Sequence, residues 1–177
     1  FRSAAWRLNQ LGHQVTVYER SDRAGGLLMY GIPNMKLDKE IVQRRINVME
    51  EVGITFVLST EVGVDVTADE LQAKYDRIII ASGASVPRDL KIKGRELHGI
   101  QFAVDYLTEC TKDVMKHGKK VTDRKLAGKH VVVIGGGDTG NDCIGSAIRQ
   151  GAASVKQLEI TPQLPAQRTA NNPWPDR

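Results

Sequence analysis

Residues 130–145, HVVVIGGGDTGNDCIG, are the stretch that decides the fold. Val131–Ile134 is a short β-branched run, which is typical of a strand buried on both faces of a parallel sheet. Three glycines follow, and residues 139–150 then show helical spacing. Because a second strand is expected at Ser154–Ile160, at the spacing that such a unit needs, the order of elements predicts a βαβ unit.

The glycines of this turn match the dinucleotide-binding pattern G-x-G-x-x-G at Gly135, Gly137 and Gly140. The first glycine permits a tight turn, the second lets the backbone approach a pyrophosphate, and the third lets helix and strand pack closely. Free N–H groups at the positive end of the helix then bind the phosphates. Glycine-rich turns without a ligand are common, but here a strand precedes the turn and a helix follows it, as the motif requires. We therefore predict a dinucleotide site.

The composition is that of an ordinary globular protein. Of 177 residues, 41% are hydrophobic and 26% are charged, so a packed core is expected and extensive disorder is not. No apolar run approaches the roughly 20 residues of a membrane helix, and no signal peptide is recognised. We therefore expect a cytoplasmic protein with no membrane partner. Cys110 and Cys143 lack C-x-x-C spacing and are expected to be small buried hydrophobes rather than a metal or redox pair.

The net charge of +4 is modest, and most basic residues alternate with acidic ones. A denser basic segment lies between two predicted elements, and it contains no aromatic residue for base stacking, so we expect no nucleic-acid partner. A solvated connection is the main interpretation of this segment, and docking of an acidic partner is the alternative. Its basic residues are Lys116, Lys119, Lys120, Arg124, Lys125 and Lys129.

The first residues of the chain match part of another dinucleotide-binding unit. A helix is expected over residues 1–11, followed by a strand at Gln14–Arg20, QVTVYER, that ends on an acidic residue. The second strand of such a unit ends on a carboxylate that binds the adenosine ribose, which makes Glu19 a candidate. An exposed strand-end charge is the alternative. The first strand and its glycine turn are expected just before Phe1.

Further elements follow in the same pattern. The pair Gly25–Gly26 suits close backbone approach to a ligand, and Asp38 is expected to cap a helix that runs to about Glu51. A strand is expected at Thr55–Leu58, and a short helix that begins at Thr67 or Asp69 and ends at Lys74.

Residues 77–81, RIIIA, predict another fully apolar strand, which runs into Ser82 and Gly83. Small residues at the end of a buried strand leave room for a ligand at the carboxyl edge of the sheet. A polar linker to about Gly99 and a helix at Gln101–Lys116 come next.

These patterns together predict an α/β protein with a Rossmann-like FAD/NAD(P)-binding fold, built in three layers with parallel sheets. We expect two partial nucleotide-binding lobes, residues 1–97 for FAD and residues 98–177 for NAD(P)H.

The sequence resembles the small (beta) subunit of NADPH-dependent glutamate synthase. Four stretches carry the resemblance and cover nearly the whole chain, and GGLLMYGIPNMKL is distinctive among flavoproteins that bind two dinucleotides. They are VTVYERSDRAGGLLMYGIPNMKLDKEIVQRR (15–45), IIIASGASVPRDL (78–90), HVVVIGGGDTGNDCIGSAIRQGAASVKQLEITPQLP (130–165) and NNPWP (171–175).

The resemblance implies an FAD domain interrupted in sequence by an NADPH domain. It also implies oxidation of NADPH, reduction of FAD, and electron transfer through iron–sulfur (4Fe-4S) clusters to a glutamate synthase large subunit, which makes glutamate from glutamine and 2-oxoglutarate. The cysteine-rich region for the clusters is expected only in a missing N-terminal region, and the FAD glycine turn and the C-terminal return to the FAD domain are also missing. We therefore expect an internal fragment that binds FAD weakly or not at all and is inactive alone.

The resemblance also implies cofactor-binding roles for residues in both lobes. Glu19 matches the FAD ribose carboxylate, with Arg20 beside the adenine, and Val62 matches an adenine contact. Backbone near the pyrophosphate and flavin is matched by Gly25, Gly26 and Leu27, and residues close to the flavin by Ser82 and Gly83. The NADPH phosphate turn is matched by Gly135, Gly137, Asp138, Thr139 and Gly140.

No catalytic residue and no metal ligand is assigned, because the cofactors themselves carry out hydride transfer. His13, His98, His117 and His130 are interpreted as surface or strand-edge residues.

The choice between NADP and NAD rests on opposing arguments. Glu159, near the end of the strand after the glycine turn, favours a free ribose hydroxyl and hence NAD, whereas Lys156 or Arg168 could neutralise a 2′-phosphate. The resemblance implies NADPH, which is our prediction.

Alternative functions are the electron-input subunit of a dihydropyrimidine dehydrogenase, a ferredoxin–NADP reductase-like sulfide reductase, and a non-catalytic nucleotide-binding module.

Overall fold

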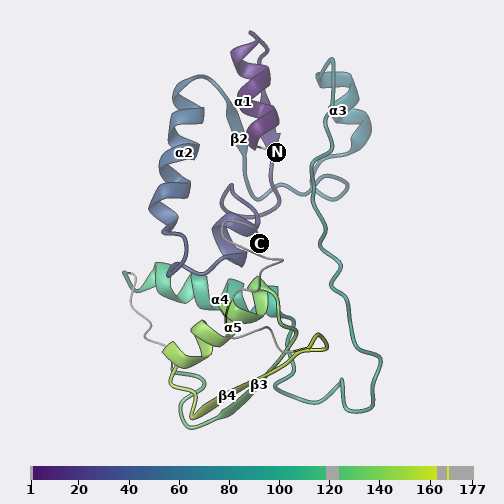
Figure 1. Cartoon of the computed structure of the whole chain (residues 1–177). Helices are drawn as coiled ribbons and strands as arrows, with labels where there is room; N and C mark the ends of the chain where they lie inside the picture. Colours follow the sequence, from purple (N-terminus) through teal and green to yellow (C-terminus); the bar gives the residue numbers. More distant parts are fainter. Residues whose placement is uncertain (1, 119–123, 163–166, 168–177) are drawn as a thin grey trace. The chain divides into compact units, whose positions relative to one another are not determined.

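The computed structural model describes residues 2–118, 124–162 and 167. The NNPWP stretch at 171–175, Arg168, and Lys119 and Lys120 of the basic segment lie outside the described residues. The chain divides into two compact units, Phe1–Asp123 and Arg124–Arg177, which are drawn with their helices and strands in Figure 1. Each unit is described by itself.

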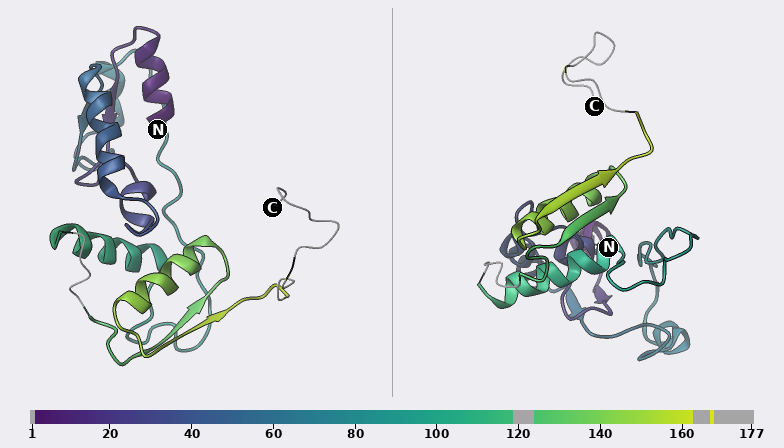
Figure 2. Two further views of the ribbon diagram at one scale, coloured as in Figure 1. Left: turned by 60° about the vertical axis from the view of Figure 1, so that its left-hand side comes forward. Right: turned by 90° about the horizontal axis from the view of Figure 1, so that it is seen from below.

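The second unit is a βαβ unit, as predicted. Strand β3 (His130–Ile134) is followed by helix α5 (Asp138–Arg149) and strand β4 (Ser154–Leu158). The strands pair in parallel, with His130 opposite Ser154 and Ile134 opposite Leu158. Helix α5 packs against both strands, and Figure 2 shows it lying along them. The unit therefore places the glycine turn at the carboxyl end of β3.

The prediction that β3 is buried on both faces is wrong. Val133 is buried, but Val132 and Ile134 keep 58% and 63% of their surface exposed. Successive side chains of a strand point to opposite faces of the sheet, and in this unit α5 covers only one of them. A continuous apolar run therefore indicates only that a strand can be buried on both faces. Whether its second face is buried depends on other residues that pack against that face.

The first unit also contains a parallel pair of strands. Helix α1 (Arg2–Gln10), strand β1 (Thr16–Tyr18), helix α2 (Lys39–Glu51) and strand β2 (Thr55–Val57) follow one another, and Val17 lies opposite Phe56. The α/β class with parallel strands is thus confirmed. One core cluster joins these elements, and partly buried Trp6, Val15, Val17 and Phe56 pack against it. Its buried members are Ala5, Ala24, Ile46, Met49 and Ile54.

A second core cluster lies where a one-turn π-helix, η1 (Leu27–Gly31), contacts helices α2 and α4 (Ala103–Lys116). Met29, Tyr30 and Val42 are buried there, and Met115 of α4 packs against them. Helix α4 therefore belongs to the first compact unit. The division into FAD and NAD(P)H lobes at residue 97 concerns nucleotide binding rather than packing, and it stays a prediction.

Helix α3 (Ala68–Lys74) has Thr67 as its N-cap, which is one of the two predicted starts, and Asp69 lies in its first turn. Thr67 Oγ1 accepts the backbone N–H of Glu70, and the Glu70 carboxylate accepts the backbone N–H of Thr67, which forms a complete capping box. Asp38 likewise caps α2 by accepting the N–H of Glu40.

The strand predicted at residues 77–81 is not formed. Residues 77–92 contain neither helix nor strand, and Figure 1 shows them as part of a long trace between α3 and α4. Ile79 and Ile80 are 59% and 88% exposed. A strand needs a neighbour that satisfies its backbone N–H and C=O groups, and among the described residues no strand lies beside this segment. The prediction was therefore wrong because this segment has no neighbouring strand to pair with, although its residues have high β propensity.

Candidate dinucleotide-binding site

The glycine turn after β3 has the predicted geometry. Gly135 has a φ of +114°, which L-residues with a side chain rarely adopt, and its N–H donates to the carbonyl of Leu158 over 2.9 Å. Gly137 is the N-cap residue of α5 and supplies no side-chain cap. The turn thus closes the end of the parallel ladder and leads directly into a helix.

Gly140 is required by packing. A Cβ atom at this position would lie 2.5 Å from the carbonyl oxygen of Gly135 and 2.9 Å from Nε2 of Gln157. Gln157 in turn donates from Nε2 to that same carbonyl over 2.7 Å. Gln157 is a residue that sequence reasoning missed, because nothing in the β4 sequence SVKQL distinguishes it from the other polar residues of the strand. This hydrogen bond from Gln157 connects β4 to the glycine turn.

The N-terminus of α5 fits a phosphate group. The N–H of Asn141 makes the first backbone bond of the helix, to the carbonyl of Gly137 over 3.1 Å. The preceding N–H groups of Asp138, Thr139 and Gly140 form the first turn, and no side chain caps them from Gly137. Asp138 and Thr139 are exposed. Uncapped N–H groups and the helix dipole together favour an anion at this position.

Glu159 lies against the same turn. Its Oε1 accepts the N–H groups of Ile160 and Thr161 over 2.7 and 3.1 Å, and its carboxylate fills the space where a Cβ of Gly136 would lie. The N–H groups of Thr161, Ile160 and then Gly136 hold the pKa of this carboxyl below its ordinary value. An ionised carboxylate therefore borders the glycine turn. Lys156 on β4 is exposed, and its alternative Arg168 lies outside the described residues.

Glu19 lies directly after β1, as the ribose hypothesis requires. Its Oε1 accepts the N–H of Ser21 over 3.0 Å, and its carbonyl accepts the N–H of Thr60 over 3.0 Å. This second bond brings the segment that leads to Val62 against the end of β1. Val62 is 49% exposed and Arg20 is exposed, so both side chains are accessible.

The Gly25–Gly26 pair adopts conformations that suit glycine, with φ values of +138° and +54°. A Cβ at Gly25 would lie 2.9 Å from Cβ of Met29, whereas a Cβ at Gly26 would meet nothing within 4 Å. Leu27 is 62% exposed. Gly25 is thus fixed by packing, and the backbone of Gly26 and Leu27 is open to a ligand.

Ser82 and Gly83 are not brought to the end of a strand. Both are exposed within the segment where no strand forms, outside the two parallel ladders. Their proximity to a flavin stays a prediction, as do the roles of the other candidate residues.

The loop around η1 carries contacts that the sequence did not reveal. Tyr30 is buried, and its hydroxyl donates to Oδ1 of Asp22 over 2.6 Å. Burial raises the pKa of the Tyr30 phenol above its ordinary value, and the Asp22 carboxylate raises it further. The ammonium of Lys112 on α4 lies 5.0 Å from the centre of the Tyr30 ring, which is within cation–π range.

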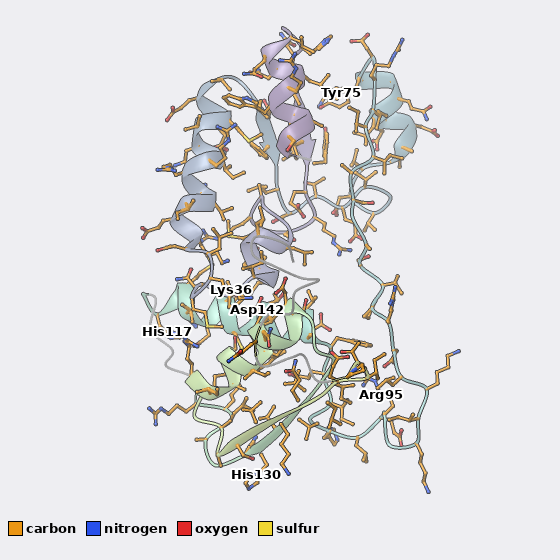
Figure 3. All side chains as sticks on the ribbon, in the orientation of Figure 1. Lys36, Tyr75, Arg95, His117, His130 and Asp142 are labelled. Atoms are coloured by element: carbon orange, nitrogen blue, oxygen red, sulfur yellow. The ribbon has the colours of Figure 1, made fainter. Side chains whose placement is uncertain are left out.

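Two sets of side chains match their sequence interpretation. His117 at the end of α4 and His130 on β3 are labelled in Figure 3, and these two residues, His13 and His98 are all exposed. His130 Nδ1 lies 2.7 Å from the Ser154 hydroxyl on the adjacent strand. Cys110 and Cys143 are buried in α4 and α5.

In the described part of the chain, no helix is both long and apolar enough to span a bilayer.

The profile of the pyridine nucleotide-disulphide oxidoreductases matches residues 2–172. The chain belongs to this family. Its family fold is also found in Mycobacterium tuberculosis FprA, whose structure was solved in complex with NADPH. The TM-score is 0.68 over 88% of this chain and 40% of that one, at 24% sequence identity, so the likeness is one of fold.

Within the family, close relatives are glutamate synthases. The chain is 55% identical over 168 residues to glutamate synthase [NADH] of Saccharomyces cerevisiae, and 53% identical over 178 residues to the small chain of glutamate synthase [NADPH] of Bacillus subtilis. These alignments cover 95% and 99% of this chain. It spans 8% of the yeast protein and 36% of the bacterial one. The predicted resemblance to the glutamate synthase small subunit is confirmed.

Proposed function

We propose that this chain is part of an NADPH-oxidising, FAD-dependent flavoprotein that supplies electrons for glutamate synthesis. The observation that carries the proposal is the glycine turn after β3, which leads into the uncapped N-terminus of α5. Gly140 leaves no room for a side chain there, and Gly137 leaves the backbone open. This combination is what a dinucleotide diphosphate needs.

The residues of each unit act by binding and orienting a nucleotide. In the second unit, the first-turn N–H groups of α5 would hold the diphosphate of NADPH, and Gln157 satisfies the Gly135 carbonyl of the same turn. In the first unit, Glu19 would bind the FAD ribose, and the open backbone at Gly26 and Leu27 would bind near the flavin. When bound, the two cofactors supply the chemistry, a hydride transfer from nicotinamide C4 to flavin N5. No side chain has to act as acid, base or nucleophile.

The partner we propose is the large subunit of glutamate synthase, reached through 4Fe-4S clusters bound by residues outside this chain. The full-length gene product should reduce a dye with NADPH when FAD is present. With the large subunit, it should form glutamate only when glutamine and 2-oxoglutarate are added. Dye reduction without glutamate formation would favour another reductase of this fold, and the absence of both would favour a non-catalytic nucleotide-binding module. A cytoplasmic location stays part of the proposal and is tested by cell fractionation.

NADH is a second candidate for the electron donor. The Glu159 carboxylate borders the glycine turn, where it would accept ribose hydroxyls and repel a 2′-phosphate. Relatives named for NADH and for NADPH are similar to this chain to almost the same degree.

Titration calorimetry of both nucleotides decides between the two donors, and tighter binding of NADH would replace NADPH in the proposal. Glu159→Gln should weaken NADH and strengthen NADPH binding. Glu51→Gln, at the exposed end of α2, is the matched control that removes a carboxylate elsewhere.

A further inference from the structure

Lys39 is a buried lysine at an unfavourable position. It is 4% exposed, and it is the first residue of α2 after the Asp38 cap. An ammonium group is rarely buried unless hydrogen bonds compensate its lost hydration. A positive charge at a helix N-terminus is also opposed by the helix dipole. The contacts of Lys39 must therefore explain why a cation lies there.

The ammonium of Lys39 bonds the backbone of η1 and of its C-cap residue, Ile32. Its Nζ donates to the carbonyl of Leu28 over 2.9 Å and to that of Ile32 over 2.5 Å. In a π-helix each carbonyl accepts from the N–H five residues later, as Leu27 does from Ile32 over 2.9 Å. For Leu28 that residue is Pro33, which has no N–H. Lys39 therefore supplies the donor that the backbone cannot.

The same turn fixes the glycine pair that precedes it. The carbonyl of Gly26 accepts the N–H groups of Met29 and Tyr30 over 3.0 and 3.1 Å, and the carbonyl of Gly25 accepts the N–H of Leu28 over 3.2 Å. Any change in the path of η1 would thus move both glycine carbonyls. The ammonium therefore bonds one carbonyl near the start of η1 and one just after its end, and the candidate flavin-binding backbone lies at the start of the same turn.

We propose that Lys39 is a positioning residue of the flavin site, which it serves by holding η1 and the Gly25–Gly26 backbone in one conformation. This inference rests on the proposed function, because the flavin role of that backbone belongs to it. A buried neutral side chain would avoid the desolvation of the ammonium but would leave the Leu28 carbonyl without its donor. The cation therefore contributes a specific backbone conformation more than net stability.

The test compares Lys39→Met, which keeps an unbranched apolar side chain but removes the ammonium group, with Arg44→Met, which removes an exposed cation from the same helix. Both variants are made in the full-length gene product and prepared free of flavin. Amide hydrogen exchange at residues 27–32 should speed up about tenfold in Lys39→Met, while that of residues 40–51 stays unchanged. FAD, titrated by its absorption spectrum, should bind about tenfold more weakly. Arg44→Met should match the unmodified protein in both measurements.

Lys39→Gln is measured alongside, because its amide can donate to the carbonyl of Leu28 or of Ile32, and it should lie between the parent and Lys39→Met. Unchanged exchange at residues 27–32, or parent-like FAD affinity in Lys39→Met, would overturn the proposal. So would unfolding of both Lys39 variants, which would assign Lys39 to folding in general. If the unmodified protein binds no FAD, the proposed function fails on that ground alone, while the exchange comparison still shows whether Lys39 holds η1.

Discussion

Gly137 offers a way to separate ligand binding from the stability of α5. Its φ and ψ are −77° and −176°, an extended conformation that any residue adopts, and a Cβ built there meets nothing within 4 Å. Serine is a favoured N-cap residue because its hydroxyl accepts a first-turn N–H. We therefore expect Gly137→Ser to leave the free energy of unfolding unchanged or to raise it by a few tenths of a kcal/mol. In a domain of this size that is about 1 °C in Tm.

The same substitution, Gly137→Ser, should weaken nucleotide binding although it does not lower the free energy of unfolding. The serine hydroxymethyl group would occupy the face of the turn that a diphosphate approaches, and its oxygen would take one of the N–H groups that hold the phosphate. The loss of one hydrogen bond to a charged group costs about 1.5–3 kcal/mol, which weakens binding by roughly 10–100-fold. The assay is titration calorimetry with NADPH and NADH, with thermal unfolding measured on the same preparations of the full-length gene product. A folded Gly137→Ser protein that binds its nucleotide as tightly as the parent would refute a diphosphate site at this turn.

Three further predictions follow from the packing and pairing of named residues. Gly140→Ala should destabilise the protein by about 1–3 kcal/mol in chemical denaturation, because its Cβ would press on the Gly135 carbonyl; an unchanged midpoint would contradict this. Tyr30→Phe should cost about 1–2 kcal/mol through the lost bond to Asp22. Because the folded pKa of Tyr30 is raised, this contribution is present below pH 10.0 and is lost as the pH rises through the folded pKa, so parent and variant should converge in alkaline denaturation. Residues 78–80 should exchange their amide hydrogens at least about tenfold more slowly in the full-length gene product than in the isolated chain, and equal rates would show that they remain unpaired.

Elements specified by neighbouring residues were predictable from the sequence. The strand, the glycine turn and the helix of residues 130–149 are each encoded locally, and the structure has them in that order. The helix start at Asp38 was also predicted, and the one at Thr67 was one of two predicted alternatives, because a capping side chain bonds an N–H two or three residues away. The spacing of the glycines predicted where the backbone turns and where it packs closely. These parts of the candidate site could therefore be predicted from neighbouring residues alone.

Contacts between distant residues were not predictable in this way. Gln157 bonds a carbonyl 22 positions earlier, and Lys39 bonds carbonyls seven and 11 positions earlier. Neither has a characteristic spacing, because each depends on where a strand or helix has already been packed. The π-helical turn at η1 escaped prediction for a related reason. Its five residues contain a glycine and precede a proline, a composition that predicts only an irregular loop.

Two apolar runs of similar composition show what such a pattern can establish. Val131–Ile134 forms a strand because β4 is brought alongside it by a short helix, whereas Ile78–Ile80 stays extended and exposed. In the usual order of a dinucleotide-binding sheet, 3-2-1-4, the fourth strand pairs with the first. Strands β1 and β2 pair with each other, and among the described residues no further strand lies beside residues 77–81. A β-branched run thus encodes the capacity to pair, and the structure adopted depends on whether a partner strand is supplied.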